Sequence, residues 1–206
     1  MRHFRIYASS LALAASLLAA PAWAGTVITK VEGEPTIDNS GVQRQAAVGM
    51  PVEAGEMVVT GPGCRVDFAI NDAVGCRLLE GTTCMIAAAN GGMKVSLSEG
   101  NVVLNLKKLP AGSTFELETP LAIASVRGTQ FWGRVPKPGT PTQTTFAVRE
   151  GTVELNVKAV GKAFTLNAGD ALDVPDGAAA ELPAVRPALA GELDAMAQAS
   201  DIATSG

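Results

Sequence analysis

Short runs in which apolar residues alternate with other residues follow one another along most of the chain. Val66, Phe68 and Ile70 occupy every second position of one such run. A period of two places the apolar side chains on one face of a β-strand. Comparable runs, some less regular, lie at 27–31, 95–97, 102–106, 114–118, 130–135, 144–148, 153–157, 164–166 and 171–174. The pattern predicts an all-β chain.

Turn signals separate these runs, and two of the runs repeat each other. Glycine, proline and asparagine gather at 61–63, 90–92, 110–112, 138–139 and 167–170, where they suit chain reversal. Residues 97–106 and 148–157 share Glu, Gly, Val, Leu and Asn at five of ten positions. Such repetition favours a single β-helix-like roll or β-solenoid-like domain whose rungs share a core. A β-sandwich whose hairpins repeat by chance stays open as the alternative.

The first 24 residues differ from the β-rich middle. They combine two arginines, a largely apolar run and small residues at Ala22 and Ala24, which is the pattern of a cleavable signal peptide. The apolar run is short for a bilayer span, which needs about 20 residues, so cleavage is favoured over an uncleaved anchor. We expect a bacterial protein that is periplasmic or secreted, with no transmembrane segment after cleavage.

The remaining chain divides into a domain and a tail. We expect one all-β domain at 25–175 and an Ala/Pro-rich linker with a short helical or disordered tail at 176–206. Leu189, Leu193 and Met196 stand at helical spacing in that tail. A frayed tail is favoured over a docked helix, because this apolar face is small.

Removing the predicted leader narrows the possible chemistry. The single histidine, His3, lies within it, so the mature chain has no Ser-His or Cys-His pair and no imidazole metal ligand. The acids are spread over turns rather than paired in a cleft. We therefore predict no catalytic residues, no metal and no cofactor. Loss of the two leader arginines leaves 14 basic against 20 acidic residues, which argues against a nucleic-acid partner.

Three cysteines remain in the predicted mature chain, and export would place them where disulfides form. If residues 77–83 form a hairpin, Cys76 and Cys84 face each other across it, and we predict a disulfide between them. Cys64 is then left over. Other pairings stay open, whereas a zinc site is disfavoured because the three cysteines lack a recognisable ligand spacing.

Residues 118–131, with the sequence ETPLAIASVRGTQF, form the most distinctive stretch. Here the chain resembles the FecR domain family, the periplasmic part of regulators that sense ferric-siderophore transport. The resemblance spans about 25–174 and implies an all-β, β-helix-like periplasmic fold. Asn71 and Asp72 depart from it, because the family usually has Asp-Gly there. The matching residues are Thr119, Pro120, Arg127, Gly128, Thr129, Phe131, Glu150 and Gly151.

We interpret this motif as structural rather than as a binding site. Gly128 would permit a bend or bulge between two strands. The Thr129 hydroxyl would satisfy a backbone group, and Arg127 would pair with an acid such as Glu118 or Glu150.

Trp132 is the better candidate for contact with a partner. If Phe131 faces the core, then Trp132 faces outward on the same side of the strand as Gln130 and Arg134. Tryptophan is a common anchor of protein interfaces and sugar sites. Burial of Trp132 beneath the proline-rich segment 136–141 is the alternative.

These observations predict a non-enzymatic, exported FecR-like domain that acts as an envelope scaffold or accessory protein through protein–protein contacts. One alternative is a ligand- or polysaccharide-binding module centred on Trp132. Another is a component of transmembrane iron- or siderophore-linked signalling. The family's regulators carry a sigma-factor-contacting segment and a membrane helix before this domain. We expect neither here after cleavage of the leader, so the resemblance carries over the fold but not the transcriptional activity.

Overall fold

The computed structural model describes residues 25–70, 73–89, 92–107, 109, 113–139, 143–177, 183–197 and 201–202. The predicted signal peptide, and Asn71 and Asp72, lie outside these ranges. The described residues form seventeen strands and one short helix, which confirms the all-β class. No helix in these ranges is long and apolar enough to cross a membrane.

The elements follow the predicted runs closely. Their bounds are β1 Thr26–Glu32, β2 Thr36–Asn39, β3 Val42–Gln45, β4 Pro51–Val52, β5 Met57–Thr60, β6 Arg65–Ile70, β7 Val74–Leu78, β8 Thr82–Ala89, β9 Gly92–Leu106, β10 Thr114–Glu118, β11 Ala122–Val126, β12 Gln130–Val135, β13 Thr144–Glu150, β14 Thr152–Val157, β15 Lys162–Asn167, β16 Asp170–Val174, β17 Val185–Pro187 and α1 Ala190–Ala195.

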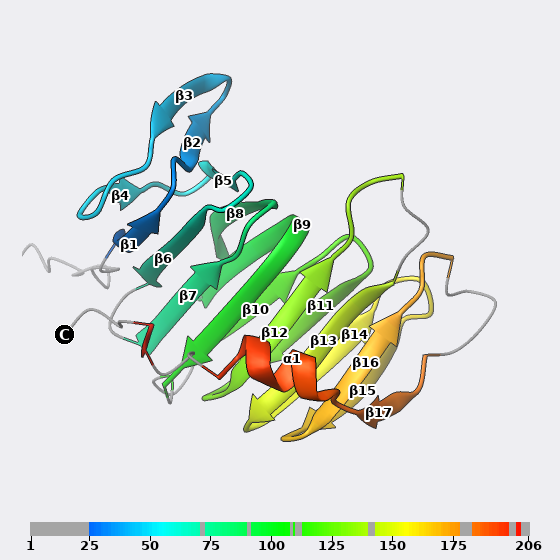
Figure 1. Ribbon diagram of the computed structural model, residues 1–206. Coiled ribbons are helices and arrows are strands. Elements are labelled where there is room, and N and C mark those ends of the chain that lie inside the picture. Colours follow the sequence, from blue (N-terminus) through cyan, green and yellow to red (C-terminus); the bar gives the residue numbers. More distant parts are fainter. Residues whose placement is uncertain are drawn as a thin grey trace, which may run out of the picture.

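The strands pair into two open sheets that enclose one core (Figure 1). Sheet A has the order β4-β1-β6-β7-β9-β12-β13-β16-β17 and is antiparallel throughout. Sheet B has the order β3-β2-β5-β8-β9-β10-β11-β14-β15, in which only β9 and β10 are parallel. The long strand β9 belongs to both sheets and joins them.

The core lies between the two sheets because the alternating runs turn their apolar side chains inward. Its largest fully buried side chains include Phe68, Phe131 and Phe146 from sheet A and Phe115 from sheet B. This strand pairing does not establish the predicted β-helix-like or β-solenoid-like architecture. Successive rungs of a parallel β-helix pair in parallel, whereas all but one of the strand pairs here are antiparallel.

The two repeated stretches form equivalent corners between the sheets. β9 pairs with β8 of sheet B before Gly100 and with β7 of sheet A after it. The second stretch pairs with β12 of sheet A as β13, and after Gly151 it pairs with β11 of sheet B as β14. The register shifts next to Thr83 in the first corner and next to Gln130 in the second. The repeated sequence thus marks one corner built twice, with the sheets exchanged.

The prediction of a hairpin over 77–83 is wrong, because β7 and β8 do not pair with each other. β7 pairs with β6 and β9 in sheet A, whereas β8 pairs with β5 and β9 in sheet B. The turn between them carries the chain from one sheet to the other. Cys76 and Cys84 are therefore not neighbours on a ladder, although both belong to the same buried core.

The tail packs onto the domain. β17 adds to the edge of sheet A, and α1 lies across the outer face of that sheet (Figure 1). Met196 is fully buried there and Leu193 is half-buried, whereas Leu189 remains 62% exposed. The docked helix, which the sequence disfavoured, is the arrangement observed. The small apolar face suffices because ion pairs, described below, hold the helix as well.

Candidate interaction surfaces

Trp132 faces away from the main core but is covered. Phe131 is fully buried between the sheets, and the next side chain, Trp132, points to the outer face of sheet A. Only 8% of Trp132 is exposed, because it packs in a second apolar cluster that includes Met196 and Ile202. The apolar side chains that cover it come from the C-terminal segment, and none of the described part of the proline-rich segment, 136–139, belongs to this cluster. No hydrogen-bond acceptor for the buried Trp132 Nε1 occurs among the described residues.

The three predicted binding residues do not form one accessible surface. Gln130 Nε2 donates a hydrogen bond to Asn105 Oδ1 at 3.4 Å. Arg134 is exposed at the other end of β12, and the covered Trp132 lies between them. A site centred on the indole would require the C-terminal segment to move.

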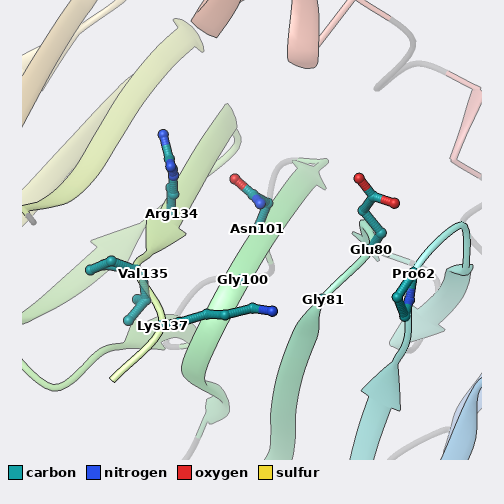
Figure 2. A pocket seen from close by; sticks show the side chains of 9 residues that line it. Pro62, Glu80, Gly81, Gly100, Asn101, Arg134, Val135 and Lys137 are labelled. Atoms are coloured by element: carbon teal, nitrogen blue, oxygen red, sulfur yellow. The ribbon is translucent and has the colours of Figure 1, made fainter. Parts of the chain in front are cut away.

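Arg134 borders a hollow at the first corner (Figure 2). The hollow has a volume of about 500 Å³ and is open to solvent. Figure 2 shows the Lys137 side chain running past Gly100 toward Gly81, with Glu80 on the far side. Glu80 Oε2 accepts a hydrogen bond from the Gly63 backbone N–H at 2.9 Å. The lining residues are Pro62, Glu80, Gly81, Gly100, Asn101, Arg134, Val135, Pro136 and Lys137.

The chemistry of this hollow does not suggest a reaction. Its charged groups are two cations and one carboxylate, so a nucleophile paired with a base is missing from its lining. No group of three or more His, Cys, Asp or Glu side chains in the described part of the chain could hold a metal ion.

The Arg-Gly-Thr motif lies at the second corner, where Gly128 and Thr129 pack against the backbone of Gly151. A Cβ on Gly151 would stand 2.6 Å from the Gly128 carbonyl oxygen and 2.6 Å from Thr129 Cγ2. Gly151 also has φ +82°, a conformation that favours glycine. The corner therefore requires Gly151 for both reasons, and Gly128 and Thr129 supply the surface against which it packs.

Two expected contacts of this motif differ in the structure. Glu118 pairs with Lys94 at 2.7 Å and Lys158 at 2.8 Å rather than with Arg127, which is exposed. The hydrogen bond from Lys158, followed by that from Lys94, holds the pKa of Glu118 below its ordinary value. Long lysine side chains from β9 and the end of β14 reach this carboxylate more readily than Arg127, which follows the next strand.

The threonine that satisfies backbone groups is Thr119 and not Thr129. The Thr119 hydroxyl donates to the Ala122 carbonyl and accepts from the Ala122 N–H, both at 3.0 Å. The Thr129 hydroxyl is buried and has no hydrogen-bond partner among the described residues. Pro120 lies in the tight turn that these Thr119 bonds close.

An ion-pair network holds the C-terminal helix to sheet A. Arg186 donates to Asp173 Oδ2 at 2.6 Å and to both Glu192 oxygens at 2.6 and 2.9 Å. The Leu189 N–H also donates to Glu192 at 2.7 Å. The hydrogen bonds from Arg186 lower the pKa of Glu192. Burial raises the pKa of Asp173, but hydrogen bonds from Arg186 and Thr145 outweigh this and leave it lowered.

The three cysteines are buried free thiols. Burial raises the pKa of Cys84 to about 12 and raises that of Cys76 well above its ordinary value. Neither thiol forms the reactive thiolate to any extent at neutral pH. The disulfide between them stays a prediction.

The sequence did not reveal one exposed edge. Among the described residues β3 pairs only with β2, so its other side is open, and the β2–β3 hairpin projects from one end of the molecule (Figure 1). Val42, at the start of β3, is 72% exposed, and Val48, in the turn after β3, is 64% exposed. Alternation in residues 36–45 is masked by polar side chains. The signal that could have found the hairpin is the Ser40-Gly41 turn, whose φ values of 53° and 90° suit a tight reversal.

Besides the pairing of β2 with β5, a buried carboxylate holds the hairpin to the rest of the domain. Arg44 Nη2 donates to Glu56 Oε2 at 2.8 Å, and the Glu53 N–H donates to the same oxygen at 2.9 Å. The hydrogen bond from Arg44 is the largest cause that lowers the pKa of Glu56 to about 2. This contact positions β3 while leaving its outer edge open.

These features define a two-sheet, all-β domain with contact surfaces and a covered aromatic residue. Residues 56–154 match the family described as FecR protein. This match covers 99 of the 206 residues, slightly less than half of the chain, and it confirms the resemblance to that family carried by the Thr-Pro, Arg-Gly-Thr and Glu-Gly motifs.

Solved structures share the fold. Two crystal structures of a predicted anti-sigma factor from Parabacteroides distasonis ATCC 8503, at 1.65 and 2.50 Å resolution, each match with a TM-score of 0.58 and 18% identity. The match covers 69% of this chain and 64% of that chain, so this chain spans less than two-thirds of those structures. A comparison with curated proteins gave no match.

Proposed function

We propose that this protein is an exported, non-enzymatic FecR-domain protein that binds another envelope protein along the open edge of β3. This proposal is supported chiefly by the projecting β2–β3 hairpin, which carries Val42, the most exposed large apolar residue of the described chain. Proteins protect edge strands with lysine, proline or bulges, and β3, with the sequence VQRQ, has none of these. Its one charged residue, Arg44, is held by Glu56. A partner strand could therefore add to this edge through main-chain hydrogen bonds.

The register identifies the backbone group that such a partner would use. Asn39 and Val42 flank a two-residue turn and pair with each other, so hydrogen-bonded and non-hydrogen-bonded pairs alternate from that point. Gln43 falls in a non-hydrogen-bonded pair with Asp38. Its N–H and C=O are therefore expected to point toward the open side of β3.

The test removes that N–H. Gln43→Pro deletes the outward donor and replaces the side chain, whereas Gln43→Thr replaces the side chain but keeps the donor and serves as the matched control. A photo-crosslinking residue at Val48 is introduced into the parent and both variants, and the proteins are expressed in the native cells. We expect one defined protein adduct with the parent and with Gln43→Thr, and at least a tenfold weaker adduct with Gln43→Pro. Equal adducts from all three at unchanged Tm would refute the edge as the docking site.

A second candidate function is a role in iron- or siderophore-linked signalling. The FecR match and the fold shared with a predicted anti-sigma factor support it. Identification of the crosslinked protein separates the two candidates: a receptor or signalling protein favours this one, and a structural envelope protein favours a scaffold role. The polysaccharide-binding alternative is less well supported, because the indole of Trp132 is 8% exposed.

A further inference from the structure

One row of residues crosses the outer face of sheet A from strand to strand. The register aligns one residue from each of six neighbouring strands: Arg77, Val103, Trp132, Ala147, Ala171 and Arg186. We call this row the lane. An arginine stands at each end, and four apolar residues lie between them. With strands about 4.8 Å apart, the lane is roughly 24 Å long.

The C-terminal segment that covers the lane has a complementary pattern. This strap comprises the described residues 188–197 and 201–202. Its apolar residues Met196 and Ile202 are buried in the cluster formed with Val103, Trp132, Ala147 and Ala171. Ile202 also packs closely on Gly75 beside the Arg77 end, where a Cβ on the glycine would lie 2.7 Å from Ile202 Cγ2.

One carboxylate of the strap binds an end of the lane, and a second lies near the other end. Glu192 binds Arg186 at 2.6 and 2.9 Å. At the other end, Asp67 holds Arg77 at 2.7 and 2.8 Å. Asp201 directly precedes Ile202, which packs on Gly75 beside Arg77. The hydrogen bond with Asp67 chiefly raises the pKa of Arg77, and the charge of Asp201 adds to this shift. Eight residues lie between the two acids. With the helical rise of α1 over 192–195 and extended chain beyond it, this separation can span up to about 25 Å. The strap is thus an apolar segment with an acid near each end, opposite in charge to the ends of the lane and comparable to it in reach.

The strap covers the lane imperfectly, so a different peptide segment could make additional contacts there. Trp132 Nε1 is buried beneath the strap with no acceptor among the described residues, and an unpaired buried donor is unfavourable. Leu189 is 62% exposed on the strap, and Val185, just before it, is 42% exposed. Only Met196 and Ile202 of the strap's large apolar side chains are fully buried, so few contacts oppose its release.

We infer that the lane is a second protein-binding surface, for which the strap is an exchangeable, autoinhibitory occupant. The partner is an amphipathic peptide segment with a carboxylate near each end, apolar residues between them and an acceptor over the Trp132 indole. The lane lies on sheet A, apart from the β3 edge of sheet B. Gln43→Pro should therefore leave lane binding unchanged, which keeps this inference and the proposed function separately testable.

The first experiment releases the strap and measures access to Trp132. In full-length protein with Trp23→Phe, Trp132 is the only tryptophan. We expect the double variant Glu192→Gln, Asp201→Asn to red-shift its emission and increase acrylamide quenching at least threefold. Leu189→Ala is the control and should change neither. Unchanged quenching in the double variant would overturn the inferred role of the two carboxylates.

The second experiment measures occupancy of the lane. A fluorescent peptide of residues 188–202 is the probe, titrated into the released variant and into the parent. We expect at least tenfold tighter binding to the released variant, and loss of that gain when both peptide acids are replaced by amides. Equal binding to parent and released protein, or no dependence on the peptide acids, would overturn the inference.

Hydrogen exchange on the unaltered protein provides a test that needs no variant. The backbone amides of 192–197 should exchange at least tenfold faster than those of β12 and β13, because the strap opens without unfolding the sheet. Exchange of the strap at the rate of these strands would show that it is a fixed part of the domain and would overturn the proposal.

Discussion

At the scale of single residues, the corner glycine Gly151 is constrained both by its backbone conformation and by its neighbours. Gly151 combines φ +82° with a backbone oxygen 2.6 Å from a would-be Cβ, whereas Gly169 has φ +89° and no neighbour within 4 Å. Gly169→Ala should therefore cost only backbone strain, about 1–2 kcal/mol. Gly151→Ala adds a clash with an immobile carbonyl and should cost about 1–3 kcal/mol more. Urea unfolding measures both, and equal losses would contradict the contact argument.

The buried thiols give a second prediction at this scale. Burial raises the pKa of Cys84 to about 12 and raises that of Cys76 well above its ordinary value, so neither should react with N-ethylmaleimide in folded, reduced protein at pH 7. Both should react after unfolding in guanidinium, because the unfolded thiol has a pKa near 8.5. Mass spectrometry counts the adducts. Labelling of either thiol in the folded chain would contradict the pKa argument.

The same spectra test the predicted disulfide. Denatured, unreduced protein from the native compartment should take up one adduct if Cys76 and Cys84 are paired and three if all cysteines are thiols. Three adducts would contradict the pairing. The sequence suggested this pair through a hairpin that is absent, so the pair now rests only on the burial of both residues in one core.

At the scale of elements, the Arg44–Glu56 contact adds to the β2–β5 pairing in holding the β2–β3 hairpin. Glu56 has a pKa of about 2 in the folded chain, below its ordinary 4.5. A lowered carboxyl pKa stabilises the fold above the unfolded value, and this stability is lost as pH falls through the folded value. We expect Glu56→Gln to destabilise the protein at pH 7 by about 3 kcal/mol at most.

The pH profile separates this charge effect from a packing effect. The difference between parent and Glu56→Gln should be constant above about pH 5 and shrink progressively toward pH 2, as the parent's carboxylate is protonated. Glu53→Gln, at an exposed neighbour, should follow the parent throughout. A difference that persists unchanged to pH 2 would show that Glu56 acts through shape alone.

Particular elements show how far the sequence could predict this fold. The strands at 66–70, 102–106 and 153–157 follow directly from alternation, because one face of each is buried and the pattern records it. The sequence repeat of 97–106 and 148–157 also reflects a structural repeat, since both stretches form the same kind of corner between the sheets. What alternation cannot specify is which sheet each strand joins, and for that reason the 77–83 hairpin was wrong.

The candidate sites were harder to predict for a related reason. Trp132 was correctly placed on the outer face, because direction follows from the neighbouring Phe131. Its cover was not predictable, since it depends on two ion pairs of Arg186 with residues from β16 and α1. The open edge of β3 likewise follows from sheet order and not from local composition.

At the scale of the whole molecule, the remaining prediction concerns the form in which the chain functions. The pattern of residues 1–24 predicts removal of the leader, with cleavage near Gly25, directly before β1. Cleavage there would remove His3 and leave Trp132 as the only tryptophan.

The protein recovered from the native envelope should therefore have an N-terminal sequence that starts at or near Gly25 and the corresponding intact mass. A signal-peptidase-blocking change at the cleavage site, Ala24→Pro, should retain the leader, whereas Ala24→Gly should not. Recovery of the uncleaved chain from the parent would contradict export by cleavage, and the partner of β3 would then have to be sought on the other side of the membrane.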